Sequence, residues 1–197
     1  YWEVPVVEGL DSIPTSDEIK HFGAAMASYG STPLFHLVGI TPEAQNLADC
    51  GGDKCHAETI TADDIEELSG GFSGCGDKLD VVVFAAPQLS IVEMQELAAL
   101  CRGVTFKVPV IVCTAPQVFG DARRMGFSAQ IEGAGGTILE GTCFYNQYAR
   151  EIGEANGWVR LLSNSAKIVN ILGGYGYKPA LASMENCVAS AIEGVIQ

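Results

Sequence analysis

Two short segments in the second half of the chain carry side chains that could do chemistry. The first ends in a thiol, because Cys143 directly follows the apolar run 137–142. The second follows the apolar run 158–162 and brings hydroxyl, amide and ammonium groups, on Ser163, Asn164, Ser165 and Lys167. Ligands of open α/β sheets bind outside the carboxyl ends of the strands. If both apolar runs are strands, the thiol and the polar groups are candidates for one site.

The polar segment has two interpretations. Backbone N–H groups at a helix start bind anions, and Lys167 adds a positive charge in a chain with only 11 Lys and Arg residues. The segment 163–167 would then bind a substrate carboxylate or phosphate. The alternative is that it simply caps the next helix. A further candidate for substrate contact is His36, although a lone His in an apolar run is more often a hydrogen-bonded core residue.

The cysteines are candidate metal ligands. Seven occur at irregular spacings and none forms a Cys-x-x-Cys pair, which argues against a zinc knuckle or a thioredoxin motif. Cys187 falls in the first turn of a predicted helix, where the helix dipole stabilises a thiolate. Cys143 follows a strand, and the two sulfurs could converge at one sheet edge; a buried apolar role is the alternative for each. The remaining cysteines, at 50, 55, 75, 101 and 113, are expected to be structural free thiols.

Apolar runs alternate with helical patterns along the chain. Continuous apolar runs favour strands buried on both faces, and they occur at 34–40, 79–85, 108–114, 137–142, 158–162 and 178–182. Capping boxes predict helix starts at Thr15 and Ser90. Further helices are expected after Thr41, over 61–69, over 118–131, after Ser165 and over 184–196. The prediction is an α/β fold with a mostly parallel sheet and helices on both faces, in three layers.

The composition restricts the function further. The 197 residues, 48% of them hydrophobic, suit one α/β domain over 1–197 with an irregular insertion at 46–78. The net charge of −13 argues against nucleic acid and anionic membranes as partners. Neither a long apolar segment nor a signal-peptide pattern occurs, and free thiols suit a reducing compartment, so a cytoplasmic location is expected.

Several short motifs carry a family resemblance. Gly141-Thr142-Cys143, followed by Ser163-Asn164-Ser165-Ala166-Lys167, resembles the paired D-T-C and T-N-S-A-K signatures of the aconitase X family of iron–sulfur dehydratases. Similar matches follow the same order at 5–10, 22–28, 34–44 and 184–188. The segment Ala85-Ala86-Pro87-Gln88 departs from the pattern, because the family usually has Gly-Cys-Pro-His there.

The resemblance implies a fragment of the large subunit or large domain of such a dehydratase. It implies an iron–sulfur cluster held by Cys143 and Cys187, with a third ligand outside this chain, and a small swivelling domain or subunit as a partner. The implied reaction is dehydration of a hydroxy acid, cis-3-hydroxy-L-proline first and mevalonate 5-phosphate as the alternative. No residue is a convincing catalytic base. A Cys-dependent enzyme and a non-catalytic α/β subunit module also stay open.

Overall fold

The structure is a computed structural model that describes residues 3–52 and 56–197, so Cys55 lies outside the described residues. The chain forms two compact units, Tyr1–Leu68 and Ser69–Gln197. The boundary falls inside the stretch 46–78 for which the sequence predicts an irregular insertion. Helix α2 (Ala62–Gly71) crosses that boundary.

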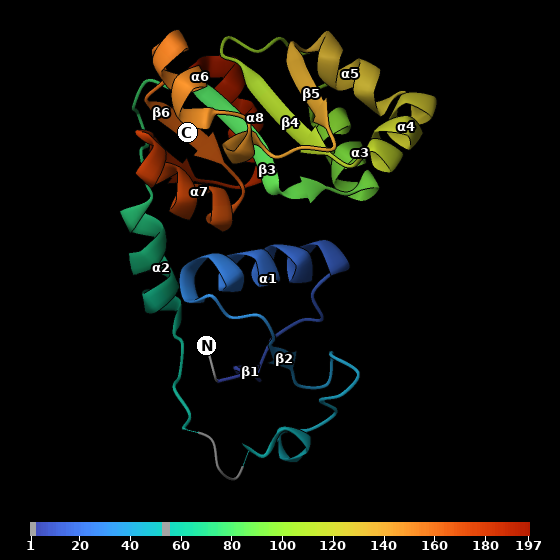
Figure 1. Ribbon diagram of the computed structural model, residues 1–197, viewed down its shortest axis with the longest axis vertical. Coiled ribbons are helices and arrows are strands. Elements are labelled where there is room, and N and C mark those ends of the chain that lie inside the picture. The colour runs from blue at the N-terminus through green and yellow to red at the C-terminus, as the bar shows by residue number, and fades with distance from the viewer. Residues whose placement is uncertain (1–2, 53–55) are drawn as a thin grey trace. The chain divides into compact units, whose positions relative to one another are not determined.

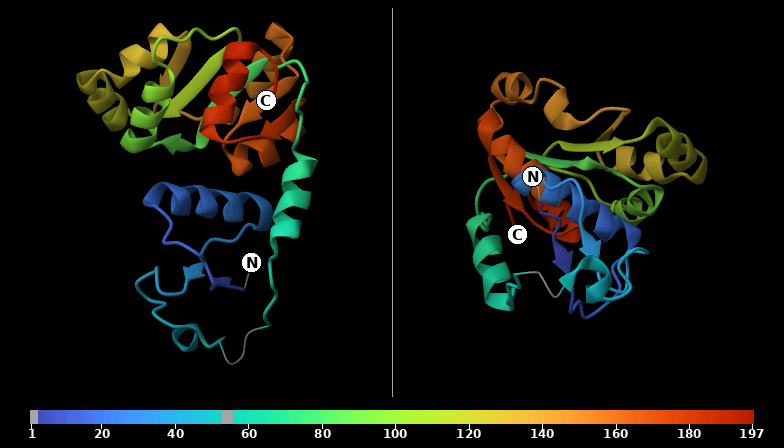
Figure 2. Two further views of the ribbon diagram at one scale, coloured as in Figure 1. Left: turned by 180° about the vertical axis from the view of Figure 1, so that it is seen from behind. Right: turned by 60° about the horizontal axis from the view of Figure 1, so that its bottom comes forward.

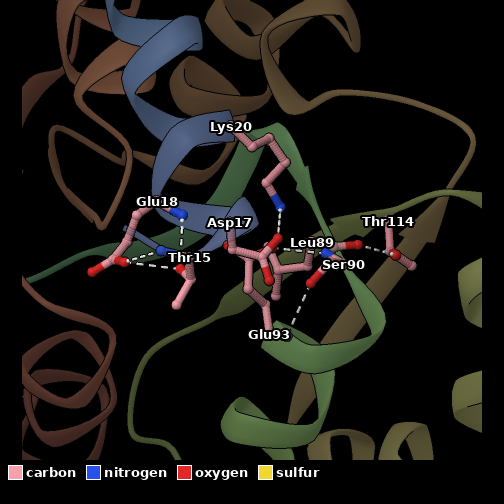
Figure 3. Close-up of polar contacts among 8 residues, drawn as sticks. All are labelled: Thr15, Asp17, Glu18, Lys20, Leu89, Ser90, Glu93 and Thr114. Atoms are coloured by element: carbon pink, nitrogen blue, oxygen red, sulfur yellow. Dashed lines mark hydrogen bonds and ion pairs between the residues drawn. The ribbon is translucent and has the colours of Figure 1, made fainter. Parts of the chain in front are cut away.

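The first unit contains one helix and one short strand pair. Helix α1 (Ser16–Gly30) begins at the predicted capping box, in which Thr15 accepts the Glu18 amide and the Glu18 carboxylate accepts the Thr15 amide (Figure 3). Strands β1 (Val6–Val7) and β2 (His36–Leu37) pair in parallel. The 3-10 helix η1 (Leu47–Cys50) follows them.

Two predictions for this unit are wrong. The apolar run 34–40 forms only a two-residue strand, because the chain turns at Gly39, whose φ is 74°. No helix begins after Thr41. Its hydroxyl instead bonds the Leu37 amide (3.1 Å) and the Leu37 carbonyl (3.2 Å), which closes a turn. A side chain that satisfies a nearby turn competes in this way with helix capping.

The second unit has one five-stranded parallel sheet, in the order β5-β4-β3-β6-β7. Its strands, each close to a predicted run, are β3 (Val81–Leu89), β4 (Val110–Thr114), β5 (Gly136–Glu140), β6 (Arg160–Ser163) and β7 (Lys178–Leu181). The helices are α3 (Ile91–Leu100), α4 (Pro116–Met125), α5 (Phe127–Gly133), α6 (Ala149–Asn156), α7 (Ala166–Leu172) and α8 (Met184–Glu193), with 3-10 turns η3 (Phe144–Asn146) and η4 (Gly173–Tyr175).

Helices cover both faces of this sheet, which confirms the predicted three-layer α/β fold (Figures 1 and 2). Alternate strand residues feed two separate apolar clusters. Val82 and Phe84 of β3 pack with residues of α3, α5 and α8, whereas Val81 and Val83 pack with residues of α6 and α7. Strands that are apolar throughout are what a sheet buried on both faces requires.

Local sequence signals explain most of the helix boundaries. Helix α3 begins at the predicted Ser90–Glu93 capping box (Figure 3). The predicted helix 118–131 is two helices, because Gly126 adopts a φ of 82° between them. Helix α6 was not predicted. In the part of the chain that the structure describes, no helix is long and apolar enough to cross a membrane.

Candidate functional site

Cys143 lies in the loop that leaves β5 at the carboxyl edge of the sheet. The loop folds back across the end of β4, since the Gly141 amide bonds the Thr114 carbonyl at 2.9 Å. Burial raises the pKa of the Cys143 thiol, and the backbone amides of Tyr145, Phe144 and Ala86, together with the charge of Lys167, oppose that rise. The sulfur is half-buried, and the pKa of its thiol stays raised because burial outweighs the amides and the lysine charge.

Lys167 and Cys143 follow different strands, yet the structure brings them close enough to interact electrostatically. Lys167 lies in the first turn of α7, directly after β6, and β3 and β4 separate β6 from β5 in the sheet. The loop after β5 bridges this gap by reaching the end of β3, where the Ala86 amide meets the sulfur. The two segments predicted to share a sheet edge do meet there.

Ser163 and Ser165 use their hydroxyls inside the protein. Both residues are buried; the Ser163 hydroxyl donates to the Val83 carbonyl at 2.6 Å and the Ser165 hydroxyl donates to the Ala86 carbonyl at 2.7 Å. Ser165 also caps α7, because its oxygen accepts the Ile168 amide. These bonds fasten β6 to the carboxyl end of β3, so the geometry assigns both hydroxyls a positioning role. Direct substrate contact by either one stays a prediction.

Asn164 differs from its two neighbours. Its Oδ1 atom is shielded from solvent and accepts no hydrogen bond within the described residues. A buried amide oxygen without a donor costs free energy. Together with Lys167, this oxygen is the group of the polar segment best able to receive a donor from a ligand.

Two residues at this edge were not predicted as site residues. Gln88 donates its amide to the Thr142 carbonyl at 2.7 Å, next to Cys143, and Gln147 donates to the Thr142 hydroxyl at 2.6 Å. They brace the loop that carries the thiol. Two sequence signals point to Gln88: the repeat of Ala-Pro-Gln after two apolar runs, at 86–88 and 115–117, and its place where the family pattern usually has His.

Cys187 lies apart from this site. It is fully buried in the apolar cluster with Val82 and Phe84, on the opposite face of the sheet from the cluster that Cys143 contacts. Burial raises the pKa of its thiol, which donates a long bond of 3.8 Å to the Ala182 carbonyl. The expected convergence of the two sulfurs is not found, so the ligand role of Cys187 stays a prediction that the geometry does not favour.

His36 belongs to the first unit, in β2. Its Nδ1 lies 3.0 Å from a Glu43 carboxylate oxygen. This pair fits the alternative interpretation, a hydrogen-bonded histidine, and substrate contact by His36 stays a prediction.

The donor set fits only part of an iron–sulfur site. Iron–sulfur clusters are held by several Cys thiolates, and residues 3–52 and 56–197 contain no group of three His, Cys, Asp or Glu side chains that could hold a metal. Cys143 suits one ligand position. Position 86, whose amide reaches the same sulfur, carries Ala and adds no thiol. Further ligands would have to come from polypeptide beyond these residues.

Comparisons with known protein families agree with the division into two units. The profile of the aconitase X second domain matches residues 2–69, and that of the aconitase X third domain matches residues 79–193. The two matches separate where the two compact units separate.

Individual relatives and a solved structure point the same way. The chain is 32% identical to the cis-3-hydroxy-L-proline dehydratase of Hypocrea jecorina, over 97% of this chain and 33% of the relative. It is 33% identical to the phosphomevalonate dehydratase large subunit of Methanothermobacter thermautotrophicus, over 82% of this chain and 39% of the relative. The crystal structure of Thermococcus kodakaraensis aconitase X, in its holo-form, superposes with a TM-score of 0.79 at 25% identity, over 96% of this chain and 47% of that chain. The chain thus spans a third to a half of the length of these relatives.

Proposed function

The chain belongs to the aconitase X family, and on that premise we propose that it forms part of a hydro-lyase that dehydrates a small hydroxy acid. The observation that carries the proposal is the placement of Cys143, after β5, and Lys167, after β6, at the carboxyl edge of one parallel sheet, within segments that match the family. Because the chain spans only part of its relatives, the complete activity requires further domains or subunits.

The residues of this chain bind and orient the substrate. Lys167 attracts the substrate carboxylate, since a charge-assisted hydrogen bond is roughly twice as strong as a neutral one. Asn164 Oδ1 accepts a hydrogen bond from a substrate amine or hydroxyl, which satisfies an oxygen that otherwise has no donor. Ser163 and Ser165 hold this turn against β3.

Cys143 is the residue of this chain that would hold an iron–sulfur cluster. Bound iron would supply Lewis-acid assistance to the departing hydroxyl group. Backbone amides around the sulfur partly offset the rise in its pKa that burial causes, and Gln88 bonds the neighbouring Thr142 carbonyl. The proton next to the carboxylate needs a base, and we propose that further polypeptide of the complete protein supplies it.

The preferred substrate is cis-3-hydroxy-L-proline. Two relatives named for that activity, from a fungus and from Pseudomonas aeruginosa, align with 97% and 98% of the chain. Mevalonate 5-phosphate is the second candidate, because relatives named phosphomevalonate dehydratase large subunit reach similar identity.

The test measures dehydration of both compounds by the complete protein, with Lys167→Met as the probe. Loss of a charge-assisted hydrogen bond of about 1.5–3 kcal/mol raises KM roughly 10- to 100-fold. The matched control is Lys178→Met, because Lys178 begins β7 at the amino edge of the same sheet. Equal kinetics for the two variants would contradict the role of Lys167, and inactivity of the wild type on both compounds would contradict the proposed substrates.

Two other functions differ in how well the site supports them. A non-catalytic subunit module is favoured by one observation, the Ala at position 86 beside Cys143 where the family usually has Cys. A Cys-dependent enzyme is disfavoured, because a catalytic thiol requires a lowered pKa, whereas burial raises the pKa of Cys143. Iron content separates the dehydratase from the module.

A further inference from the structure

Two of the free cysteines, Cys113 and Cys143, come near each other at the carboxyl edge of the sheet. Cys113 is the last residue but one of β4. The loop that follows β5 crosses the end of this strand, because the Gly141 amide bonds the Thr114 carbonyl at 2.9 Å. Cys143 comes two residues later in the same loop. The pairing of β4 with β5 therefore brings together two cysteines that are distant in the sequence.

The two thiols lie on the same face of the sheet. Cys113 belongs to the apolar cluster that also contains Ala85 of β3, and Cys143 packs against that cluster. The backbone amide of Phe144 is a hydrogen-bond partner of both sulfurs. The amide of Ala86, the residue after Ala85, reaches the Cys143 sulfur as well. A shared donor and a shared cluster make the two sulfurs neighbours.

Solvent reaches the two thiols to different extents. Cys113 is fully buried, whereas Cys143 is half-buried in the loop. A small reagent in solution therefore reacts first with Cys143, since access is one of the conditions that govern thiol exchange. Cys113 lies behind it and is placed to attack a sulfur that is already bonded to Cys143. This is the arrangement of an exposed reactive thiol beside a resolving thiol.

We propose that Cys113 and Cys143 form a reversible disulfide in the iron-free protein, with a small-molecule disulfide such as oxidised glutathione as the oxidant. The Cys143 sulfur loses its proton and attacks the reagent, whose S–S bond breaks and releases one free thiol. The Cys113 sulfur then loses its proton and attacks the mixed disulfide at the Cys143 sulfur. The bond between the two cysteines forms and a second free thiol leaves, so the two electrons given up by the cysteines reduce the reagent.

Burial makes this disulfide slow to form and slow to reduce. Attack requires a thiolate, and burial raises the pKa of both thiols, that of Cys113 to about 12. Strongly oxidising disulfides are those whose reduced form is stabilised, and a buried pair with raised pKa values lacks that stabilisation. Once formed, the bond withholds Cys143 from iron, a consequence that rests on the proposed function.

Peptide mapping tests the disulfide directly, because trypsin separates the two cysteines. Cys113 falls in the peptide 108–123 and Cys143 in the peptide 125–150, and neither peptide contains another cysteine. The complete protein, reduced and freed of iron, is incubated with oxidised glutathione at pH 8 for a day, and the remaining thiols are then alkylated. Mass spectrometry should find the two peptides linked in at least about half of the molecules, and dithiothreitol should separate them. Absence of the linked pair would overturn the proposal.

Two alanine variants assign the second step to Cys113. In Cys113→Ala, glutathione should stay bound to Cys143 in at least about tenfold more molecules than in the wild type, because the resolving thiol is missing. Cys101→Ala is the matched control and should form the linked pair as the wild type does, since Cys101 is also buried but lies in the cluster on the other face of the sheet. Equal glutathionylation of Cys143 in Cys113→Ala and in the wild type would contradict the proposal. These measurements use neither iron nor a dehydratase assay, so they succeed or fail independently of the proposed function.

Discussion

Replacing Ser163 with Ala should destabilise the second unit strongly, although it removes one oxygen atom. The hydroxyl is fully buried, donates to the Val83 carbonyl at 2.6 Å and accepts the Ser165 amide at 3.2 Å. Alanine leaves both backbone groups without this partner in a dry core. A buried group that loses its hydrogen bond costs about 1–3 kcal/mol, so we expect a total loss of about 2–3 kcal/mol.

The assay is urea unfolding followed by circular dichroism at 222 nm, together with calorimetry. The expected loss lowers the melting temperature by roughly 10 °C for a unit of this size, with an unchanged dependence on urea concentration. Ser69→Ala, at an exposed position in α2, is the control and should change stability by less than about 0.5 kcal/mol. A loss for Ser163→Ala as small as that of the control would refute the positioning role.

Three further predictions concern the same unit. Gly153→Ala should destabilise it despite the helical position, because the added Cβ would lie 2.7 Å from the Tyr177 hydroxyl oxygen. Gly120→Ala in α4 should instead stabilise it by about 0.5–1 kcal/mol. Only the end of a side chain lies within 4 Å of the added Cβ there, and the same urea titration measures both variants. Burial raises the pKa of Tyr177 to about 12, so the unfolded chain loses this proton first and stability should fall as the pH rises above 10. Unfolding titrations at pH 9–12 should show a shallower fall of stability for Tyr177→Phe. Equal slopes for the two proteins would argue against burial of the phenol. Iodoacetamide at pH 8 should modify the exposed Cys75 and spare Cys113. Cys113 is fully buried, and burial raises the pKa of its thiol to about 12. Peptide mass spectrometry measures the labelling, and equal labelling of the two cysteines in the folded protein would contradict the structure.

The sheet of the second unit was predictable because its strands are apolar on both faces. A run such as 79–85 needs cover on both sides whatever its neighbours are, so local composition alone predicts a strand buried on both faces. Caps behaved in the same way: Thr15 and Ser90 begin helices because their partners Glu18 and Glu93 lie three residues later. Interactions within one turn of the chain are visible in the sequence.

Features that depend on distant residues were not predictable. The run 34–40 is as apolar as the strands of the second unit, but it pairs over only two residues with β1. Cys187 sits one helical turn from the carboxyl edge, and only its packing against Val82 and Phe84 reveals which face of the sheet it joins. The bracing of Thr142 by Gln88 joins residues 54 positions apart, and no local pattern reports such a contact.

The same limits apply to the candidate site. Sequence patterns named the thiol and the polar segment, and the structure adds which groups are free to act. Ser163 and Ser165 are already hydrogen-bonded to β3, whereas Asn164 Oδ1 has no donor among the described residues. Side-chain hydroxyls have the same appearance in a sequence whether they bind the backbone or a ligand.

Iron content tests the central claim most directly, because it is independent of the substrate. Iron, acid-labile sulfide and the visible spectrum should be measured on the complete protein prepared without oxygen, and on its Cys143→Ser and Cys187→Ala variants. The account predicts a coloured, iron-containing wild type, loss of iron and colour in Cys143→Ser, and retention of both in folded Cys187→Ala, since Cys187 is packed in the core on the other face of the sheet. An iron-free wild type, or a Cys143→Ser variant that keeps its iron, would contradict the assignment of Cys143 as the ligand.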